Sequence, residues 1–246
     1  MARIVGILGG MGPLATADLY RKIIQATPAR RDQDHLHVVI EADPSVPDRT
    51  AALRGEAPDP TPWLVRGAHR LEAAGAAFIA VPCNTAHAFL PVVRPQVGIP
   101  ILDMIEETAE RVRTGFPSAR RVGILATAGT VGSGLYHRAL ERHGLEGIAP
   151  SEEVQAGLVD AAIAAVKGGE SGSEAGERLV EAARTLVDAG AEVLLAACTE
   201  IPLVLTAEMA PAPLVDPTWV LAEAAVREAR AESPAVGAGL PAAARA

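Results

Sequence analysis

The four residues VGIL at Val5–Leu8 recur as VGIL at Val122–Leu125. Each copy leads into a turn of small residues, GGMG after the first and ATAG after the second. Further along, LEAAGAAFIAVPCNT at Leu71–Thr85 aligns with LVDAGAEVLLAACTE at Leu186–Glu200, and the offset between paired residues stays constant. An ordered series of matches of this kind predicts that the chain contains two copies of one structural unit.

The unit itself alternates short apolar runs with longer amphipathic stretches. In the first copy the apolar runs are Ile4–Leu8, His37–Ala42 and Ala77–Val81, and the helical stretches between them are Ala15–Ala26 and Leu64–Ala74. Apolar runs without polar alternation are typical of parallel strands that are buried on both faces. We therefore expect an α/β fold of two equivalent lobes. The carboxyl ends of their strands would face a shared cleft, where open α/β sheets bind ligands.

A third match suggests where the lobes divide. IPILD at Ile99–Asp103 resembles APLVD at Ala212–Asp216, with the prolines and aspartates in step. The sequence predicts a first lobe of residues 1–103 plus 216–246 and a second lobe of residues 104–215. Residues 232–246 are rich in Ala, Gly and Pro and show no amphipathic period, so we expect no packed element there.

The composition argues against several classes of protein. The 246 residues are 49% hydrophobic and 21% charged, which is enough apolar material for a core and unlike a disordered chain. A net charge of −8 is a poor match to nucleic-acid binding. Two cysteines are too few for a disulfide framework, and no apolar run has the length of a secretory signal or a membrane span. We expect a cytoplasmic protein that binds neither nucleic acid nor membrane.

Cys83 and Cys198 are the only cysteines, and they occupy equivalent places in the two copies. Each stands where a predicted strand ends, so both would reach the cleft. A single cysteine is more often a small buried apolar residue, and a disulfide between the two is disfavoured in a reducing compartment. Two thiols on opposite sides of one carbon would allow a thiolate to remove a proton and a thiol to return one with inversion. A helix beginning beside each cysteine would lower its pKa.

The motifs around these cysteines resemble those of the aspartate/glutamate racemase superfamily, most of all the cofactor-independent aspartate racemases. The matching segments are GILGGMGPLAT (Gly6–Thr16), PDRTA (Pro47–Ala51), PCNTAHAF (Pro82–Phe89), LATAGT (Leu125–Thr130) and ACTEIPLVL (Ala197–Leu205). The similarity extends from Arg3 to Glu228. The resemblance implies two Rossmann-like lobes related by pseudo-symmetry, assembled as a homodimer. It also implies that two cysteines interconvert L- and D-aspartate without pyridoxal phosphate.

Aspartate carries a second carboxylate, which needs a cation. The resemblance implies that Arg49 and Lys167 bind it, because aspartate racemases have an arginine and a lysine at the matching positions. An arginine can hold a carboxylate with two hydrogen bonds, whereas a lysine acts as a point charge. Taken alone, Arg49 reads as a surface arginine paired with Asp48. Lys167 then reads as a lysine at the negative end of the helical stretch Leu158–Gly169.

Polar residues near the turns complete the predicted site. Asn84, Thr85 and Thr199 follow the cysteines and could bind the α-carboxylate with their backbone amides, or cap helices. His87 and Glu200 could tune the neighbouring cysteines or serve as packed polar groups. The residues expected to contact the substrate are Met11, Arg49, Asn84, Thr85, Thr127, Thr130, Lys167 and Thr199.

Other functions stay open at this point. The sequence GMGPLA at Gly10–Ala15 fits the dinucleotide fingerprint, with Asp43 available for a ribose, which would suggest a nicotinamide-dependent oxidoreductase. That interpretation leaves the matched cysteines unexplained. A related decarboxylase or isomerase that uses cysteine, or an amino-acid-binding protein, would need similar residues. The histidines, including His35 and His37, show no metal-ligand spacing with the cysteines, so no metal is expected.

Overall fold

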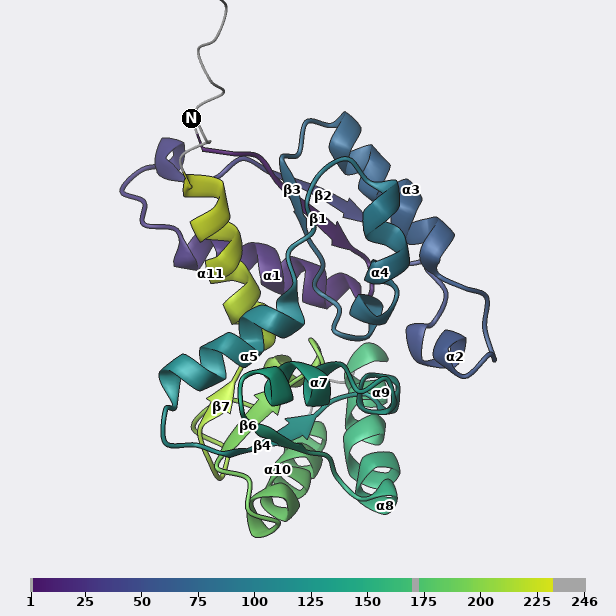
Figure 1. The fold of residues 1–246 in the computed structure, drawn as a ribbon, viewed down its shortest axis with the longest axis vertical. Coiled ribbons are helices and arrows are strands. Elements are labelled where there is room, and N and C mark those ends of the chain that lie inside the picture. The colour runs from purple at the N-terminus through teal and green to yellow at the C-terminus, as the bar shows by residue number, and fades with distance from the viewer. Residues whose placement is uncertain (1, 170–172, 232–246) are drawn as a thin grey trace, which may run out of the picture.

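Two parallel β-sheets, one in each lobe, form the frame of the molecule (Figure 1). The computed structural model describes residues 2–169 and 173–231, so the predicted unpacked tail at 232–246 lies outside the described residues. The first sheet has the order β2-β1-β3, with β1 at Val5–Gly9, β2 at Val38–Ala42 and β3 at Phe78–Ala80. The second has the order β5-β4-β6-β7. Its strands are β4 (Arg121–Leu125), β5 (Glu146–Ile148), β6 (Val193–Ala196) and β7 (Leu214–Val215).

The two sheets share one topology. A parallel bridge joins Ile79 of β3 to Ile101, as β6 pairs with β7 through Leu194 and Leu214. Ile101 and Leu214 hold the same place in the matched IPILD and APLVD segments. The prediction of two similar α/β lobes with parallel strands is therefore confirmed.

The repeated glycine of VGIL has the same packing role in both lobes. A Cβ on Gly6 would lie 2.9 Å from the Cβ of Ala76, and one on Gly123 would lie 3.1 Å from the Cβ of Ala191. Ala76 and Ala191 are paired in the aligned repeat, just after each helix ends. A side chain on either glycine would push the end of that helix off the strand, so only glycine permits this close approach.

Helices cover both faces of each sheet. Those of the first lobe region are α1 (Pro13–Ala26), α2 (Arg49–Leu53), α3 (Thr61–Ala73), α4 (Leu90–Val93) and the 3₁₀ turns Asp32–Asp34, Thr85–Ala88 and Arg94–Gln96. Next come α5 (Met104–Gly115), α6 (Ala128–Gly132), α7 (Leu135–Arg142), α8 (Glu152–Val154), a π-helical segment (Gln155–Asp160) and α9 (Ala161–Lys167). The chain ends with α10 (Ser173–Asp188), the 3₁₀ turn Ile201–Leu203 and α11 (Pro217–Arg230). Two helices start earlier than predicted because Pro13 and Pro62 fit the first helical turn, where no backbone N–H is needed.

Helices α5 and α11 cross between the lobes. Helix α5 follows the first sheet, yet Ile105 and Val112 lie in the core of the second lobe. Helix α11 follows β7, yet Leu221 and Ala225 pack with β1 and α1. The two helices also contact each other (Figure 1). The lobe boundaries expected from the sequence stay a prediction.

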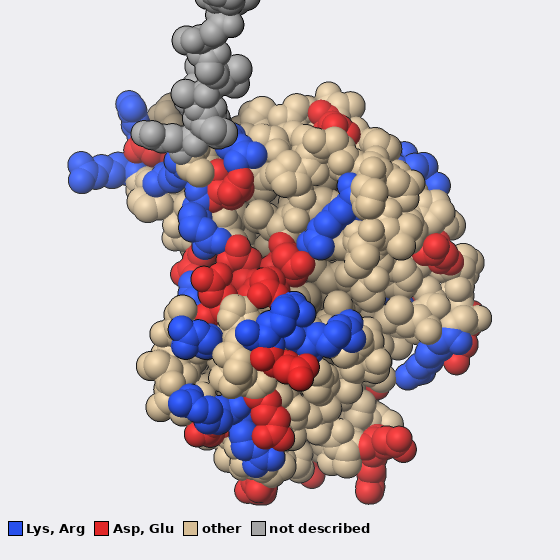
Figure 2. All heavy atoms as spheres, in the orientation of Figure 1, with Lys and Arg blue, Asp and Glu red and all other residues tan. Residues whose placement is uncertain are grey.

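Acidic and basic side chains lie side by side where α5 and α11 meet (Figure 2). Arg111 of α5 pairs with Glu223 of α11, and Arg227 of α11 lies 2.6 Å from Glu107 of α5. Exposed pairs of this kind contribute little each, about 0 to 1 kcal/mol. None of the helices in residues 2–169 and 173–231 combines the length and the hydropathy of a membrane-spanning segment.

Candidate active site

The carboxyl ends of both sheets open onto one narrow pocket with about 280 Å³ of atom-free space. The first lobe contributes residues that follow β1 and β3 and residues of the α2 region. The second lobe contributes residues that follow β4 and β6, together with the end of α9. The lining consists of Met11, Asp48, Arg49, Thr50, Cys83, Asn84, Thr85, Thr127, Lys167, Cys198, Thr199 and Glu200. The cleft expected at the strand ends is present, and nearly all predicted site residues meet in it.

Both cysteines line this pocket. Cys83 and Cys198 are free thiols and are each 6% exposed. Each is followed by a short 3₁₀ helix, Thr85–Ala88 in the first lobe and Ile201–Leu203 in the second. The repeat therefore brings one sulfur-bearing residue from each lobe to the same pocket, as the sequence predicts.

The carboxylate of Glu200 is the direct partner of Cys198. The Cys198 Sγ donates a hydrogen bond to Glu200 Oε2 at 3.0 Å, and the Thr199 hydroxyl donates to the same oxygen at 3.3 Å. Burial raises the pKa of the Cys198 thiol well above its usual value, and the negative charge of Glu200 raises it further. The Glu200 backbone N–H at the start of the following 3₁₀ turn lowers this pKa as expected, but burial and the charge of Glu200 outweigh it, so the net shift is upward.

Arg49 is a buried cation whose charge has no ionic partner among the described residues. Its guanidinium donates to three carbonyl oxygens, those of Val46 at 3.1 Å, Pro47 at 3.0 Å and Met11 at 3.3 Å. Its Nε is buried and has no hydrogen-bond partner within the described chain. Asp48 does not pair with it, because Asp48 caps α2 by accepting from the Ala51 N–H at 2.8 Å. A buried guanidinium without a carboxylate favours the binding of an anion.

Lys167 brings a second positive charge to the pocket from the end of α9. Much of its side chain is exposed, and it forms no ion pair with any described residue. Partial burial lowers the pKa of Lys167, but the thiolate form of Cys198, the Glu200 carboxylate and the thiolate form of Cys83 outweigh that effect, so the net shift is upward. Lys167 therefore stays charged and adds to the attraction for an anion.

Three threonine hydroxyls join the lobes beside the pocket. Thr85 Oγ1 of the first lobe lies 3.0 Å from Thr127 Oγ1 and 2.8 Å from Thr130 Oγ1 of the second. Thr127 also caps α6 by accepting from the Thr130 N–H at 3.2 Å. Thr130 is buried at 1% exposure and does not line the pocket, unlike Thr85 and Thr127. The structure thus places Thr130 behind Thr85 as a support, rather than where a substrate would touch it.

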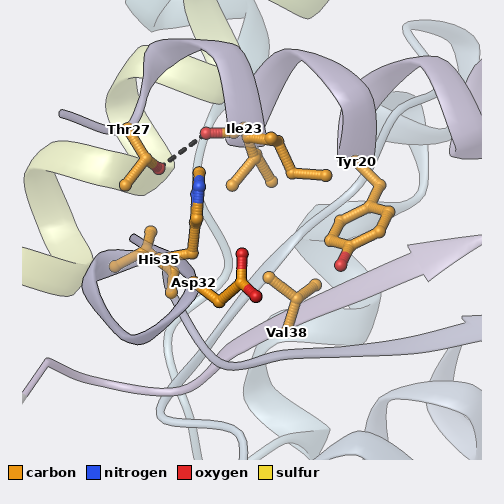
Figure 3. A pocket seen from close by; sticks show the side chains of 8 residues that line it. Tyr20, Ile23, Thr27, Asp32, His35 and Val38 are labelled. Carbon is orange, nitrogen blue, oxygen red and sulfur yellow. Dashed lines mark hydrogen bonds between the residues drawn. The ribbon is translucent and has the colours of Figure 1, made fainter. Parts of the chain in front are cut away.

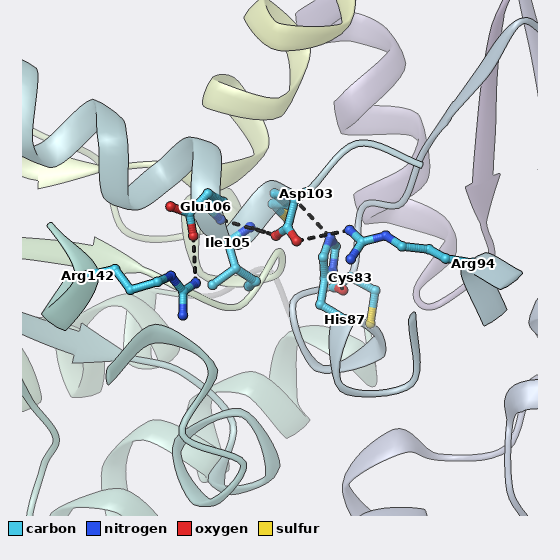
Figure 4. Close-up of polar contacts among 8 residues, drawn as sticks. Cys83, His87, Arg94, Asp103, Ile105, Glu106 and Arg142 are labelled. Carbon is cyan, nitrogen blue, oxygen red and sulfur yellow. Dashed lines mark hydrogen bonds and ion pairs between the residues drawn. The ribbon is translucent and has the colours of Figure 1, made fainter. Parts of the chain in front are cut away.

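His87 lies behind Cys83 and does not line the pocket (Figure 4). Its Nε2 accepts from the Met104 N–H at 3.2 Å, so its Nδ1 carries the proton and donates to the Cys83 carbonyl at 2.9 Å. Burial lowers the pKa of His87, although the negative charge of Asp103 opposes this. Neutral His87 therefore ties the backbone of Cys83 to the start of α5.

Two acidic residues at the start of α5 form ion pairs with neighbouring segments. Asp103 caps α5 and lies 2.9 Å from Arg94, while Glu106 lies 2.6 Å from Arg142 of α7 (Figure 4). Helix α5 is thereby joined to both lobes on either side of its first turn.

A wider hollow of about 760 Å³ lies elsewhere on the first lobe, between α1 and β2 (Figure 3). It is lined by Tyr20, Asp32 and His35 among others, and the Thr27 hydroxyl beside it donates to the Ile23 carbonyl at 2.6 Å. It holds none of the predicted site residues. We place the candidate site at the smaller pocket because it unites two thiols with two cations that have no ionic partner in residues 2–169 and 173–231.

Sequence reasoning missed two residues of the lining, Asp48 and Thr50. Both residues flank Arg49 in the PDRTA segment, and that position next to a predicted site residue is the feature of the sequence that could have identified them. The dinucleotide interpretation finds no support in the geometry, because the Asp43 carboxylate accepts from the Ser45 N–H and hydroxyl on an exposed turn outside the pocket. Among residues 2–169 and 173–231, no group of three or more His, Cys, Asp or Glu side chains is arranged to hold a metal ion.

Comparisons with known proteins point to one family. The model of the family described as Asp/Glu/Hydantoin racemase matches residues 8–225. The broad specificity amino-acid racemase RacX of Bacillus subtilis (strain 168) is 29% identical over 229 residues, which cover 91% of this chain and 96% of the relative. The aspartate racemase of Picrophilus torridus has a similar structure, with a TM-score of 0.82 and 30% identity over 92% of this chain and 94% of that one.

A more distant structure shows the fold alone. The glutamate racemase of Francisella tularensis, solved with D-glutamate, has a TM-score of 0.67 and 16% identity, with 91% of this chain and 79% of that chain covered. Because the family model spans nearly the whole sequence and the two-lobed fold agrees with it, the chain belongs to the Asp/Glu/hydantoin racemase family.

Proposed function

We propose that this chain is a cofactor-independent racemase of acidic amino acids that interconverts L- and D-aspartate with two cysteines. The observation that supports this most directly is the shared pocket, in which Cys83 and Cys198 approach from opposite lobes. The two similar lobes provide one proton-transfer group on each side of a bound substrate. One group on each face allows a proton to be removed from one side of the carbon and returned to the other, which inverts it.

The proposed reaction conserves atoms and charge. The thiolate of one cysteine takes the α-proton, so the C–H bond breaks and an S–H bond forms. The electron pair left on the α-carbon is shared with the α-carboxylate. The thiol of the other cysteine then gives its proton to the opposite face, which leaves a thiolate on that side and the inverted amino acid in the pocket.

The surroundings of Cys198 suggest how its role alternates. Its raised pKa favours the thiol, so it is ready to return a proton when Cys83 acts as the base. In the opposite direction Cys198 must first lose that proton. Glu200 Oε2, at 3.0 Å from the sulfur, is the acceptor positioned to take it.

Substrate preference follows from the two cations. We infer that Arg49 and Lys167 hold the side-chain carboxylate of aspartate, since both line the pocket and neither has an acidic partner among the described residues. The charge that develops next to the α-carbon needs donors in a site with little water, and losing one such donor typically slows a reaction about 10²- to 10³-fold. The backbone amides after each cysteine, together with Asn84, are suited to that task.

The test is to incubate L-aspartate and D-aspartate separately in heavy water with no added cofactor. We expect each enantiomer to convert into the other, and the newly formed enantiomer to carry α-deuterium before the remaining substrate does. Absence of inversion with aspartate would overturn the proposal. Deuterium uptake without inversion would indicate one-sided proton transfer, and binding without either reaction would indicate an amino-acid-binding protein. The homodimer and the cytoplasmic location expected from the sequence stay predictions.

A further inference from the structure

Tyr136 is a polar side chain of the second lobe that lies fully inside the protein. It belongs to the first turn of α7, is 1% exposed and packs in the core of the second sheet. A buried phenol needs a hydrogen-bond partner for its hydroxyl. That partner is Asn84 of the first lobe, whose Oδ1 accepts from the Tyr136 hydroxyl at 2.6 Å.

This hydrogen bond determines how the Asn84 carboxamide lies. Burial raises the pKa of Tyr136, so the phenol keeps its proton and can serve as the donor. With Oδ1 occupied by Tyr136, the Nδ2 group of Asn84 is the end left for the pocket. Asn84 lines the pocket and is 3% exposed, and its Nδ2 has no hydrogen-bond partner in the described part of the chain. A buried amide donor of this kind favours an acceptor oxygen from a bound molecule.

The chemistry of the pocket identifies that oxygen. Asn84 is next to Cys83, whose sulfur must reach the α-carbon in the proposed function, and the α-carboxylate is attached to the same carbon. Arg49 and Lys167 are the cations available for the other carboxylate. We propose that Tyr136 is a positioning residue, whose hydroxyl reaches from the second lobe to hold Asn84 so that its Nδ2 donates to the α-carboxylate of the substrate. This inference rests on the proposed function for the identity of the substrate.

The neighbouring residue is held in the same way. Thr85 follows Asn84 and bonds to Thr127 and Thr130 of the second lobe. Two consecutive residues after Cys83 are therefore tied to the opposite lobe. Asn84 Nδ2 is therefore positioned for the α-carboxylate only while the two lobes keep these hydrogen bonds.

The main experiment compares Tyr136→Phe with wild type, using two ligands that differ in the group concerned. β-Alanine has the amino group and distal carboxylate of aspartate but no α-carboxylate. We expect the variant to raise KM for aspartate about tenfold, the effect of one lost hydrogen bond to a charged group, and to leave inhibition by β-alanine unchanged. Tyr20→Phe is the matched control, because Tyr20 is the chain's other tyrosine and lies in the α1 hollow. It should behave as wild type.

A double-mutant cycle separates positioning from general loosening. If Tyr136 acts through Asn84, then Tyr136→Phe should add nothing to the loss caused by Asn84→Ala. Independent, additive losses would overturn the proposal, and so would an unchanged KM for aspartate in Tyr136→Phe.

A second variant covers the case in which Tyr136→Phe fails to fold. Asn84→Asp keeps an oxygen for the Tyr136 hydroxyl and replaces the Nδ2 donor with a second oxygen. Because the new carboxylate repels either ligand, we expect the binding of aspartate to weaken at least about tenfold more than the binding of β-alanine, and equal losses for the two ligands would contradict the proposal. If wild type binds aspartate without inverting it, the proposed function fails. Calorimetric titration of aspartate against β-alanine then still tests the role of Tyr136.

Discussion

Cys198 donates a hydrogen bond to Glu200, whereas the residue that matches Glu200 in the first lobe, Thr85, bonds to the opposite lobe instead. The two cysteines are equivalent in the repeat, but only the second has a carboxylate two residues away as its direct partner. The pseudo-symmetry of the fold is therefore broken at the atoms that would move protons. This asymmetry leads to different expectations for the two halves of the site.

Replacing either cysteine by serine should abolish inversion. In Cys83→Ser and Cys198→Ser the hydroxyl is far less acidic than the thiol, and losing one acid–base group typically costs about 10²- to 10⁴-fold. The measurement is chiral analysis together with α-deuterium content in heavy water. One-sided exchange without inversion is allowed by the two-base assignment, but wild-type rates of inversion in either variant would contradict it.

The pKa of Cys198 should respond in opposite directions to two substitutions. Glu200→Gln removes a negative charge that raises this pKa, so the thiolate should form at lower pH than in wild type. Lys167→Met removes a positive charge that lowers it, so the thiolate should form at higher pH. The thiolate absorbance in the ultraviolet, recorded against pH in a Cys83→Ser background, reports this single group. A shift of the same sign in both variants would refute the described electrostatics.

Specificity for the side-chain carboxylate should depend on Arg49 and Lys167. Arg49→Ala or Lys167→Ala should reduce turnover of aspartate about 10- to 100-fold more than that of alanine, which lacks this group, because a hydrogen bond to a charged group is worth about 1.5 to 3 kcal/mol. Arg54 is an exposed residue at the end of α2, so Arg54→Ala is the matched control and should change the turnover of neither aspartate nor alanine. Equal losses on both substrates would remove Arg49 and Lys167 from this role.

The stability of the protein should depend on pH through His87. Because burial lowers its pKa below the ordinary 6.5, the unfolded chain binds more protons than the folded one once the pH falls under that value. The stabilisation is complete above pH 6.5 and is lost as the pH falls toward the lowered pKa. His87→Gln should be less stable by about 1 to 3 kcal/mol at neutral pH, since it disturbs two buried hydrogen bonds, and should lose this pH dependence. Urea unfolding at a series of pH values measures the free energy of unfolding of the wild type and of His87→Gln. His69→Gln, at an exposed position, is the control. His137, whose pKa burial also lowers, contributes a slope of the same sign, so a slope that is unchanged in His87→Gln would assign the effect to that group or another.

Much of the fold could be predicted because the repeat is a local pattern. VGIL and the helix–glycine–strand stretches each depend on residues close in sequence, so they describe strands and helices without knowledge of what packs against them. The contact of Gly6 with Ala76 and that of Gly123 with Ala191 show why the pattern persists. The placement of Cys83 and Cys198 at strand ends follows from the same local signal.

Only the tertiary structure decided the electrostatics of the site. The raised pKa of Cys198 comes from burial beside Glu200. The position of the Arg49 guanidinium comes from its hydrogen bond to the Met11 carbonyl, and the orientation of Asn84 comes from Tyr136 of the other lobe. Desolvation and hydrogen bonding depend on distances between segments far apart in the chain, which no periodicity encodes. The sequence by itself determined two lobes with a cysteine at each strand end. Which groups stay charged, and which donors are left for a ligand, was decided by how the lobes close on each other.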